Sequence, residues 1–242
     1  MGLEESDALK AFEVVIQSGA IFAVCLLYRR DLLGHLSGLV QKKKASVQFF
    51  LNIFLAFLPA AVLGLLFHSW IKEHLFSVGV VVSTLFLGGV IMIISERKFR
   101  QRDEKKALSS EHRELEHHKL SPKNAFVIGL FQCLAMIPGT SRSWSTILGA
   151  RFQGLKPAAA AEFSFFLALP TLMGASVLDF YLNFDLLMKW NPLLLLVGTL
   201  VSFFVAVVVI KLFIAYLKSR SLEVFGWYRI AISLFMSALI WL

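Results

Sequence analysis

The chain has 242 residues, of which 57% are hydrophobic and 17% charged, and its mean hydropathy is +0.73. This composition is far more apolar than that of soluble globular domains, so it excludes a soluble protein and predicts one embedded in a membrane. The net charge of +8 comes from basic residues in short links between apolar runs, a pattern typical of cytoplasmic loops and not of a surface that binds nucleic acid.

Apolar segments of spanning length follow one another along the chain. A transmembrane helix needs roughly 20 mainly apolar residues, and a first segment at about 10–28 is predicted to cross although it carries Glu13 and Gln17. Five further segments reach this length readily, at about 49–67, 77–95, 160–182, 193–217 and 224–242. The sequence therefore predicts an all-α, polytopic membrane protein with about six transmembrane helices.

The stretch 122–155 differs from these spans. Two apolar arms, near 124–137 and 144–152, flank a polar centre, and each arm is too short to cross a bilayer. Irregular backbone at membrane depth is tolerated only where protein or a water-filled cavity surrounds it. We therefore expect a re-entrant helical hairpin.

Basic residues predict the orientation. The links after the first and third spans are rich in Lys and Arg, whereas the links at 68–76 and 183–191 hold only Lys72 and Lys189. Because Lys and Arg concentrate in cytoplasmic loops, the basic links should face the cytoplasm. Both ends of the chain should then lie on the outer side.

The hydrophilic segment 97–121 divides the chain into a first repeat, 1–96, and a second, 122–242. Its His112, His117 and His118 have no carboxylate or thiolate frame, so a solvated linker is the better reading than a metal tract. Weak self-similarity between the two parts, with three crossings each, predicts an inverted repeat.

The two repeats are expected to differ at their start. The second begins with the hairpin 122–155, whereas only about ten residues precede the opening span of the first. The first repeat is therefore expected to be truncated. An upstream start, a truncated product and a repeat that never had a hairpin all stay open.

The loop from Pro138 to Thr146, with the sequence Pro-Gly-Thr-Ser-Arg-Ser-Trp-Ser-Thr, is the concentrated polar sequence at membrane depth. Proline ends the first arm, and Gly139 permits a turn from which the second arm starts with free N–H groups. Such a helix end, with its positive dipole, binds anions. Arg142 adds a guanidinium suited to phosphate. Hydroxyls come from Thr140, Ser141, Ser143 and Thr146.

A purely structural reading of this loop is the alternative. The hydroxyls would then cap the helix, and Arg142 would extend to the headgroups. A charged residue within an apolar hairpin costs several kcal/mol unless it has a partner or a wet cavity, so the anion site is favoured. Glu162 is expected either beside this site or at the membrane interface. Gln132 is expected to hydrogen-bond inside the bundle, and Arg229 to anchor a helix start.

Several motifs, in order, resemble the bacterial undecaprenyl-diphosphate phosphatase family, also called the bacitracin-resistance family. The resemblance runs from about residue 3 to the C-terminus. It is carried by Phe12 to Gln17, Pro59 to Gly64, Phe131 to Cys133, Pro138 to Ser143 with Thr146, and Ala161 to Phe165.

The resemblance implies an enzyme that removes the terminal phosphate of undecaprenyl diphosphate and so recycles the lipid carrier of peptidoglycan synthesis. It implies catalytic roles for Ser141, Arg142 and Thr146. The loop chemistry itself predicts substrate binding by Gly139, Thr140 and Ser143, and Glu162 is assigned to substrate binding with them. The resemblance also implies Mg²⁺ or Ca²⁺, whose ligands are expected in a glutamate-rich first hairpin that this sequence does not contain. No metal ligand is therefore assigned here.

Further expectations follow from this reading. The partners are a polyprenyl diphosphate lipid and the bilayer, without nucleic acid, and a homodimer stays open. The protein is expected in the bacterial inner membrane, with its site facing the periplasm. An inactive, truncated family member and a flippase of the same lipid are the alternatives.

Overall fold

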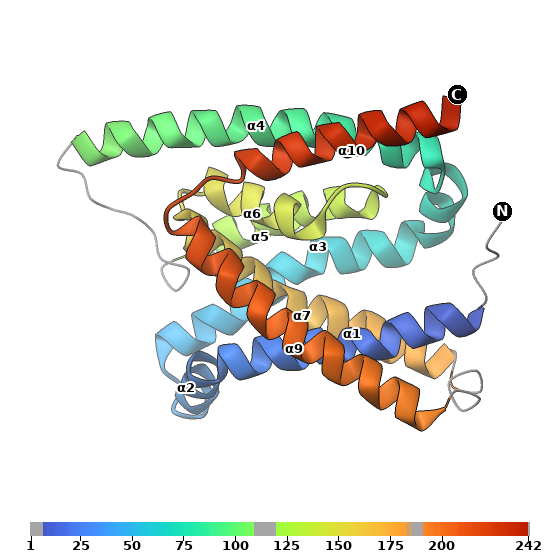
Figure 1. The fold of residues 1–242 in the computed structure, drawn as a ribbon. Coiled ribbons are helices and arrows are strands. Elements are labelled where there is room, and N and C mark those ends of the chain that lie inside the picture. The colour runs from blue at the N-terminus through green and yellow to red at the C-terminus, as the bar shows by residue number, and fades with distance from the viewer. Residues whose placement is uncertain (1–6, 109–119, 183, 185–190, 242) are drawn as a thin grey trace. The chain divides into compact units, whose positions relative to one another are not determined.

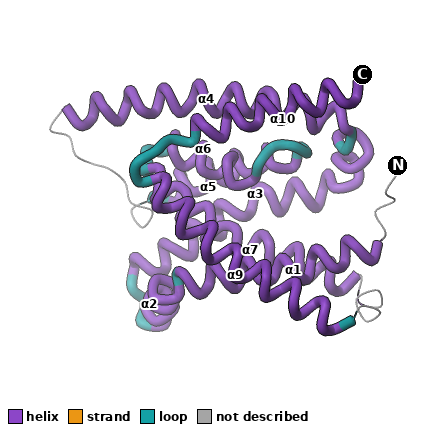
Figure 2. Tube along the Cα trace, in the orientation of Figure 1, coloured by secondary structure: helices purple, strands orange, loops and turns teal. Residues whose placement is uncertain are grey.

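The computed structural model describes residues 7–108, 120–182, 184 and 191–241 (Figure 1). These residues form helices joined by short loops, and no strand occurs among them (Figure 2), which confirms the all-α class. The helices are α1 Asp7–Leu27, α2 Arg29–Val40, α3 Lys44–Leu75, α4 Val78–Leu108, α5 Pro122–Gln132, the 3-10 helix η2 Cys133–Met136, α6 Arg142–Phe152, α7 Pro157–Leu182, α9 Pro192–Leu217 and α10 Glu223–Trp241.

Five of the described helices are long and apolar enough to cross a membrane, as predicted for these segments. The spans are Lys44–Phe67, Val78–Lys105, Pro157–Gly174, Pro192–Leu217 and Glu223–Ile240. Large apolar side chains are exposed along them, which is the surface that lipid covers in such proteins. The apolar part of α1, Val15–Leu27, is shorter, so the sixth crossing stays a prediction.

Helix α4 extends further than the sequence predicted. It was expected to end near residue 95, yet it continues to Leu108, because the Glu, Arg, Lys and Gln residues that follow are good helix formers. The first part of the predicted linker 97–121 is therefore helical. His112, His117 and His118 lie outside the described residues.

The chain forms two compact units that are interleaved in sequence. One comprises Met1–Val47 and Phe165–Ile214, and the other Gln48–Ser164 and Ala215–Leu242. These units come from spatial contacts, whereas the predicted repeats 1–96 and 122–242 express a likeness within the sequence. The division into two repeats therefore stays a prediction.

Glycines allow close helix packing in the first unit. A Cβ atom on Gly19 of α1 would collide with the carbonyl oxygen of Thr199 on α9, and one on Gly198 would lie 2.7 Å from Ile16. Small residues let backbones approach in this way in membrane proteins. A small apolar core around Val24 and Ile210 adjoins these contacts.

The second unit contains the predicted hairpin and the helices that hold it. Helix α10 packs along α4 (Figure 1), where a Cβ atom on Gly89 would lie 2.7 Å from the carbonyl oxygen of Gly226. Helix α5 packs as closely on α3, since a Cβ on Gly129 would lie 2.5 Å from the carbonyl oxygen of Ala56. These contacts fix the surroundings of the polar loop.

Candidate anion-binding site

The polar loop joins two short helices. Helices α5 and α6 have 11 residues each, or about 16 Å at 1.5 Å per residue, roughly half of the hydrocarbon thickness. They pack against one another, with η2 completing the first arm. The predicted helical hairpin at 122–155 is thus present, and its loop comprises residues 137–141.

Gly139 makes the turn possible. Its φ angle is +85°, a left-handed conformation that residues with a Cβ atom adopt only with strain. A Cβ here would also collide with Oγ1 of Thr84 and lie 2.6 Å from the carbonyl oxygen of Val81. Two independent constraints therefore require glycine at this position.

The carbonyl groups of the loop are directed toward the protein. The Pro138 oxygen accepts a hydrogen bond from Oγ1 of Thr84 at 2.5 Å, and the Gly139 oxygen accepts one from Nη2 of Arg229 at 2.9 Å. The Ile137 oxygen accepts from the Thr140 amide at 3.0 Å. These oxygens are consequently not available to repel an anion.

The amide groups of the loop show the opposite pattern. Within the described part of the chain, the N–H groups of Gly139, Ser141, Arg142 and Ser143 have no hydrogen-bond acceptor. The last two belong to the first turn of α6, where the helix dipole is positive. A run of free donors at such a helix end is the arrangement that binds phosphate groups.

Hydroxyl groups surround these amides. Ser141 is the N-cap of α6, and its Oγ accepts a hydrogen bond from the Trp144 amide at 3.3 Å. Its hydroxyl hydrogen stays available to a ligand because Ser141 is exposed. Thr140 and Ser143 are half-buried, and among the described residues their hydroxyls have no hydrogen-bond partner.

Two guanidinium groups lie at the loop: Arg142 follows it directly in the chain, and Arg229 donates a hydrogen bond to it from α10. Arg142 is half-buried at the first position of α6, while Arg229 of α10 is only 7% exposed. Neither forms an ion pair with an acidic side chain among the described residues. Since buried charges are normally paired, this positive charge favours an anionic ligand.

Thr146 is hydrogen-bonded within the protein. It is 1% exposed, and its Oγ1 lies 2.6 Å from Oγ of Ser164 on α7 and 3.1 Å from the Arg142 carbonyl oxygen. The side chain thus fastens α6 to α7. A direct contact of Thr146 with phosphate stays a prediction.

Glu162 lies on the second turn of α7, since the helix begins at Pro157 and not near residue 160 as expected. It is half-buried. Its position is about 200° around the helix from Ser164, which contacts α6. That contact therefore does not bring Glu162 to the loop, and its role in substrate binding stays a prediction.

Two other polar residues have surroundings that differ from the expectation. Gln132, expected to hydrogen-bond within the bundle, is 2% exposed, and neither amide atom has a partner among the described residues. Arg229 was expected to anchor a helix start. It lies instead on the second turn of α10 and is bonded to the loop, and its charge within an apolar helix was the signal that could have revealed this.

Among the residues that the structure describes, metal-ligating side chains are not clustered. In the described ranges, no group of three or more His, Cys, Asp or Glu side chains is placed to hold a metal ion. Cys25 and Cys133 are free thiols. The donors gathered at the loop are N–H, hydroxyl and guanidinium groups, which suit an anion and not a cation.

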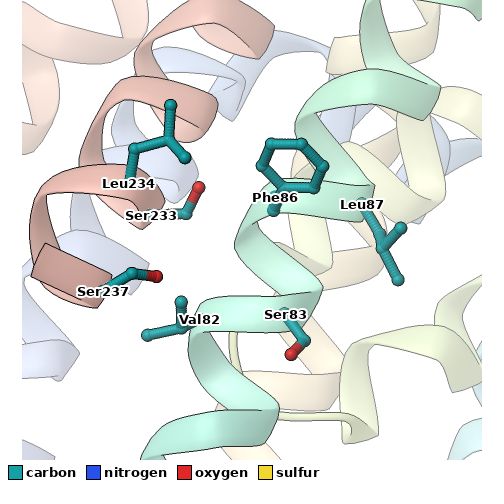
Figure 3. A pocket seen from close by; sticks show the side chains of 7 residues that line it. All are labelled: Val82, Ser83, Phe86, Leu87, Ser233, Leu234 and Ser237. Atoms are coloured by element: carbon teal, nitrogen blue, oxygen red, sulfur yellow. The ribbon is translucent and has the colours of Figure 1, made fainter. Parts of the chain in front are cut away.

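A groove lies elsewhere on the same unit, between α4 and α10 (Figure 3). Its volume is about 370 Å³. None of the predicted site residues lines it. The lining residues are Val82, Ser83, Phe86, Leu87, Ser233, Leu234 and Ser237.

The helices and the loop define a class: a polytopic, all-α membrane protein with a broken helical hairpin whose turn offers donors to an anion. The chain belongs to the bacitracin resistance protein BacA family, whose profile matches residues 1–235. The resemblance seen in the motifs is thereby confirmed.

Curated relatives agree with this assignment. The chain is 41% identical to an undecaprenyl-diphosphatase of Acinetobacter baumannii over 227 residues, which cover 94% of this chain and 80% of the relative. It is 41% identical to one from Bordetella avium over 237 residues, with 97% and 84% covered. The identity to one from a Polaromonas species is 43% over 237 residues, with 98% and 83% covered.

Proposed function

We propose that this protein removes the terminal phosphate of undecaprenyl diphosphate, which yields undecaprenyl phosphate and inorganic phosphate. The observation that carries the proposal is the set of free amides at Gly139, Ser141, Arg142 and Ser143, next to a guanidinium without an acidic partner in the described chain. The names of the relatives supply the substrate class.

The chemistry breaks the bond between the terminal phosphorus and the bridging oxygen. The oxygen of the attacking water ends on inorganic phosphate, and the bridging oxygen stays with the lipid monophosphate. Negative charge builds up on the terminal and bridging oxygens during this step. The loop amides and Arg142 are placed to stabilise that charge, and the Ser141 hydroxyl to orient the terminal phosphate.

The lipid part of the substrate suits a membrane protein with exposed apolar helices. In this proposal the prenyl chain stays in the hydrocarbon region while the diphosphate reaches the loop. The protein lies in the bacterial inner membrane, and the loop opens to the periplasm. The basic links of the sequence support this orientation through the positive-inside rule.

A divalent cation is a further part of the proposal. Family resemblance implies Mg²⁺ or Ca²⁺, which would neutralise phosphate charge when bound. The described residues do not fit such an ion, so we propose that carboxylates outside them hold it. The roles given to the loop do not depend on this ion.

Replacement of Arg142 tests the proposal. Phosphate release from undecaprenyl diphosphate is measured in detergent with Mg²⁺ or Ca²⁺, and the dissociation constant of the lipid is measured in parallel. In Arg142→Ala and Arg142→Lys, phosphate release and lipid affinity should each fall at least about a hundredfold. Both substitutions remove the bidentate guanidinium and its charge-assisted hydrogen bonds.

Arg30→Ala is the matched control, since Arg30 is an exposed cation on α2, and it should behave as the wild type. Near-normal release and binding by Arg142→Ala would remove the assignment. Transport of the lipid across vesicles without phosphate release would favour a flippase instead.

A further inference from the structure

Two side chains from helices distant in the sequence hold adjacent carbonyl groups of the loop. Thr84 of α4 donates to the Pro138 oxygen at 2.5 Å, and Arg229 of α10 donates to the Gly139 oxygen at 2.9 Å. The Thr84 hydroxyl also lies 2.9 Å from the Val80 carbonyl oxygen. Its single hydrogen serves one acceptor at a time, and the loop oxygen is the nearer one.

Arg229 has surroundings that packing alone does not explain. It is 7% exposed, its Nη2 also lies 3.3 Å from the Thr84 carbonyl oxygen, and its Cζ lies 5.5 Å from the centre of the Trp144 ring. Carbonyl dipoles and an aromatic ring, with no carboxylate from the described chain, therefore surround its charge. A buried cation without a counter-ion is costly, and α4 and α10 already pack through glycines.

The geometry of the peptide bond gives these contacts a consequence. In a planar trans peptide the C=O and N–H groups point in opposite directions. When Thr84 holds the Pro138 oxygen, the free Gly139 amide is directed away from α4. When Arg229 holds the Gly139 oxygen, the next peptide is fixed so that its Thr140 amide closes the turn on Ile137.

We propose that Arg229 is a positioning residue for phosphate binding, which acts through the Gly139 carbonyl and is assisted by Thr84. It keeps the loop carbonyls turned inward and the free amides turned toward the ligand, and it places a positive charge beneath the turn. It does not touch the phosphate itself. This inference rests on the proposed function for its ligand, a lipid diphosphate.

Two variants disturb this contact in different ways. Arg229→Gln removes the charge and keeps a donor. Gly88→Ala leaves Arg229 in the sequence but places a Cβ atom 2.5 Å from its Nη2 and 3.2 Å from its Cζ. Because this is the end of a flexible side chain, the guanidinium should move while the backbone stays. Gly79→Ala is the matched control, since a Cβ there meets nothing within 4 Å.

Two measurements are made on the full chain in detergent. The first is the dissociation constant of farnesyl diphosphate, a short prenyl diphosphate. Arg229→Gln and Gly88→Ala should each raise it at least about tenfold, because a charge-assisted hydrogen bond is lost. The dissociation constant of Arg229→Lys should lie between those of these two variants and that of the wild type. Gly79→Ala should have the wild-type dissociation constant.

The second measurement is amide hydrogen exchange in residues 137–143. Both disruptive variants should speed exchange in this segment and leave α5 unchanged, a local effect that a general loss of packing would not give. If Arg229→Gln does not fold, Gly88→Ala decides. Wild-type affinity and wild-type exchange in Gly88→Ala would overturn the inference.

The two proposals fail in different ways. Suppose that the wild-type chain does not bind the diphosphate, or that Arg142→Ala binds it as well as the wild type does. The proposed function is then wrong. If Gly88→Ala still speeds amide exchange in the loop, Arg229 nevertheless positions the loop as inferred. If Arg142→Ala loses binding but Gly88→Ala and Arg229→Gln bind normally, the positioning role alone is wrong.

Discussion

The two ends of helix α6 each carry an arginine, and the two arginines have opposite surroundings: one has an acidic partner and the other has none among the described residues. At the C-terminal end, Arg151 has a side chain that is 4% exposed, and it pairs with Asp103 at 2.5 Å. It also donates to the Leu155 carbonyl oxygen at 2.7 Å and lies 5.0 Å from the Phe99 ring centre. At the N-terminal end, Arg142 has no acidic partner within the described chain.

The helix dipole sharpens this difference. A cation is favourable at the C-terminal end of a helix and unfavourable at the N-terminal end. Arg151 therefore meets both conditions for a stabilised cation, a counter-ion and the favourable helix end, whereas Arg142 violates both, because it has no acidic partner within the described chain and lies at the positive end. An anion at the loop would relieve both violations, which is why we assign binding to one end of α6 and stability to the other.

The largest expected effect concerns the turn at the binding end. Gly139→Ala would force a residue with a Cβ atom into a left-handed conformation, at a conformational cost of about 1–2 kcal/mol. The new Cβ would also collide with Thr84. The free amides would lose their common direction, so binding of undecaprenyl diphosphate should weaken at least about a hundredfold. Gly34→Ala, at an open helical position, is the control and should bind the lipid normally. Normal binding by Gly139→Ala would show that the turn has no part in binding.

The next effect concerns the structural end. Asp103→Asn leaves the buried Arg151 without its counter-ion and should lower the free energy of unfolding by about 2–3 kcal/mol, less than for a fully buried pair because the Asp103 side chain is 38% exposed. Lipid binding by the folded fraction should not change. Denaturant titration measures the stability, with Glu104→Gln, an exposed neighbour, as the control. A binding defect at full stability would contradict the division of roles.

The smallest effect compares the two N-caps of the hairpin. Ser121 caps α5 and Ser141 caps α6, each accepting a hydrogen bond from a backbone amide. Alanine at either position should lower stability by about 1 kcal/mol. Ser141→Ala should also weaken lipid diphosphate binding severalfold, whereas Ser121→Ala should not. Equal binding by the two variants would remove Ser141 from the site.

The local parts of this structure could be predicted from the sequence. The spans follow from apolar length, and the turn at Gly139 with its helix end at Arg142 follows from a Pro-Gly pair and a cap residue in order. These features depend on neighbouring residues, whose chemistry is visible in one stretch of sequence.

The long-range contacts could not be predicted. Thr84 precedes Pro138 by 54 residues and Arg229 follows Gly139 by 90, and neither separation leaves a periodic signal. The Thr146 hydroxyl contacts Ser164 on α7, a partner that the loop motif does not reveal, and its predicted contact with phosphate stays a prediction. The direction in which a helix presents a side chain depends on packing that a single motif does not encode.

Amide hydrogen exchange with and without undecaprenyl diphosphate tests the central assignment most directly. At saturating lipid, we predict slower exchange in residues 139–143 and no change in residues 148–155 at the other end of α6. Protection at the Arg151 end, or unchanged exchange at 139–143 with the lipid bound, would contradict the account.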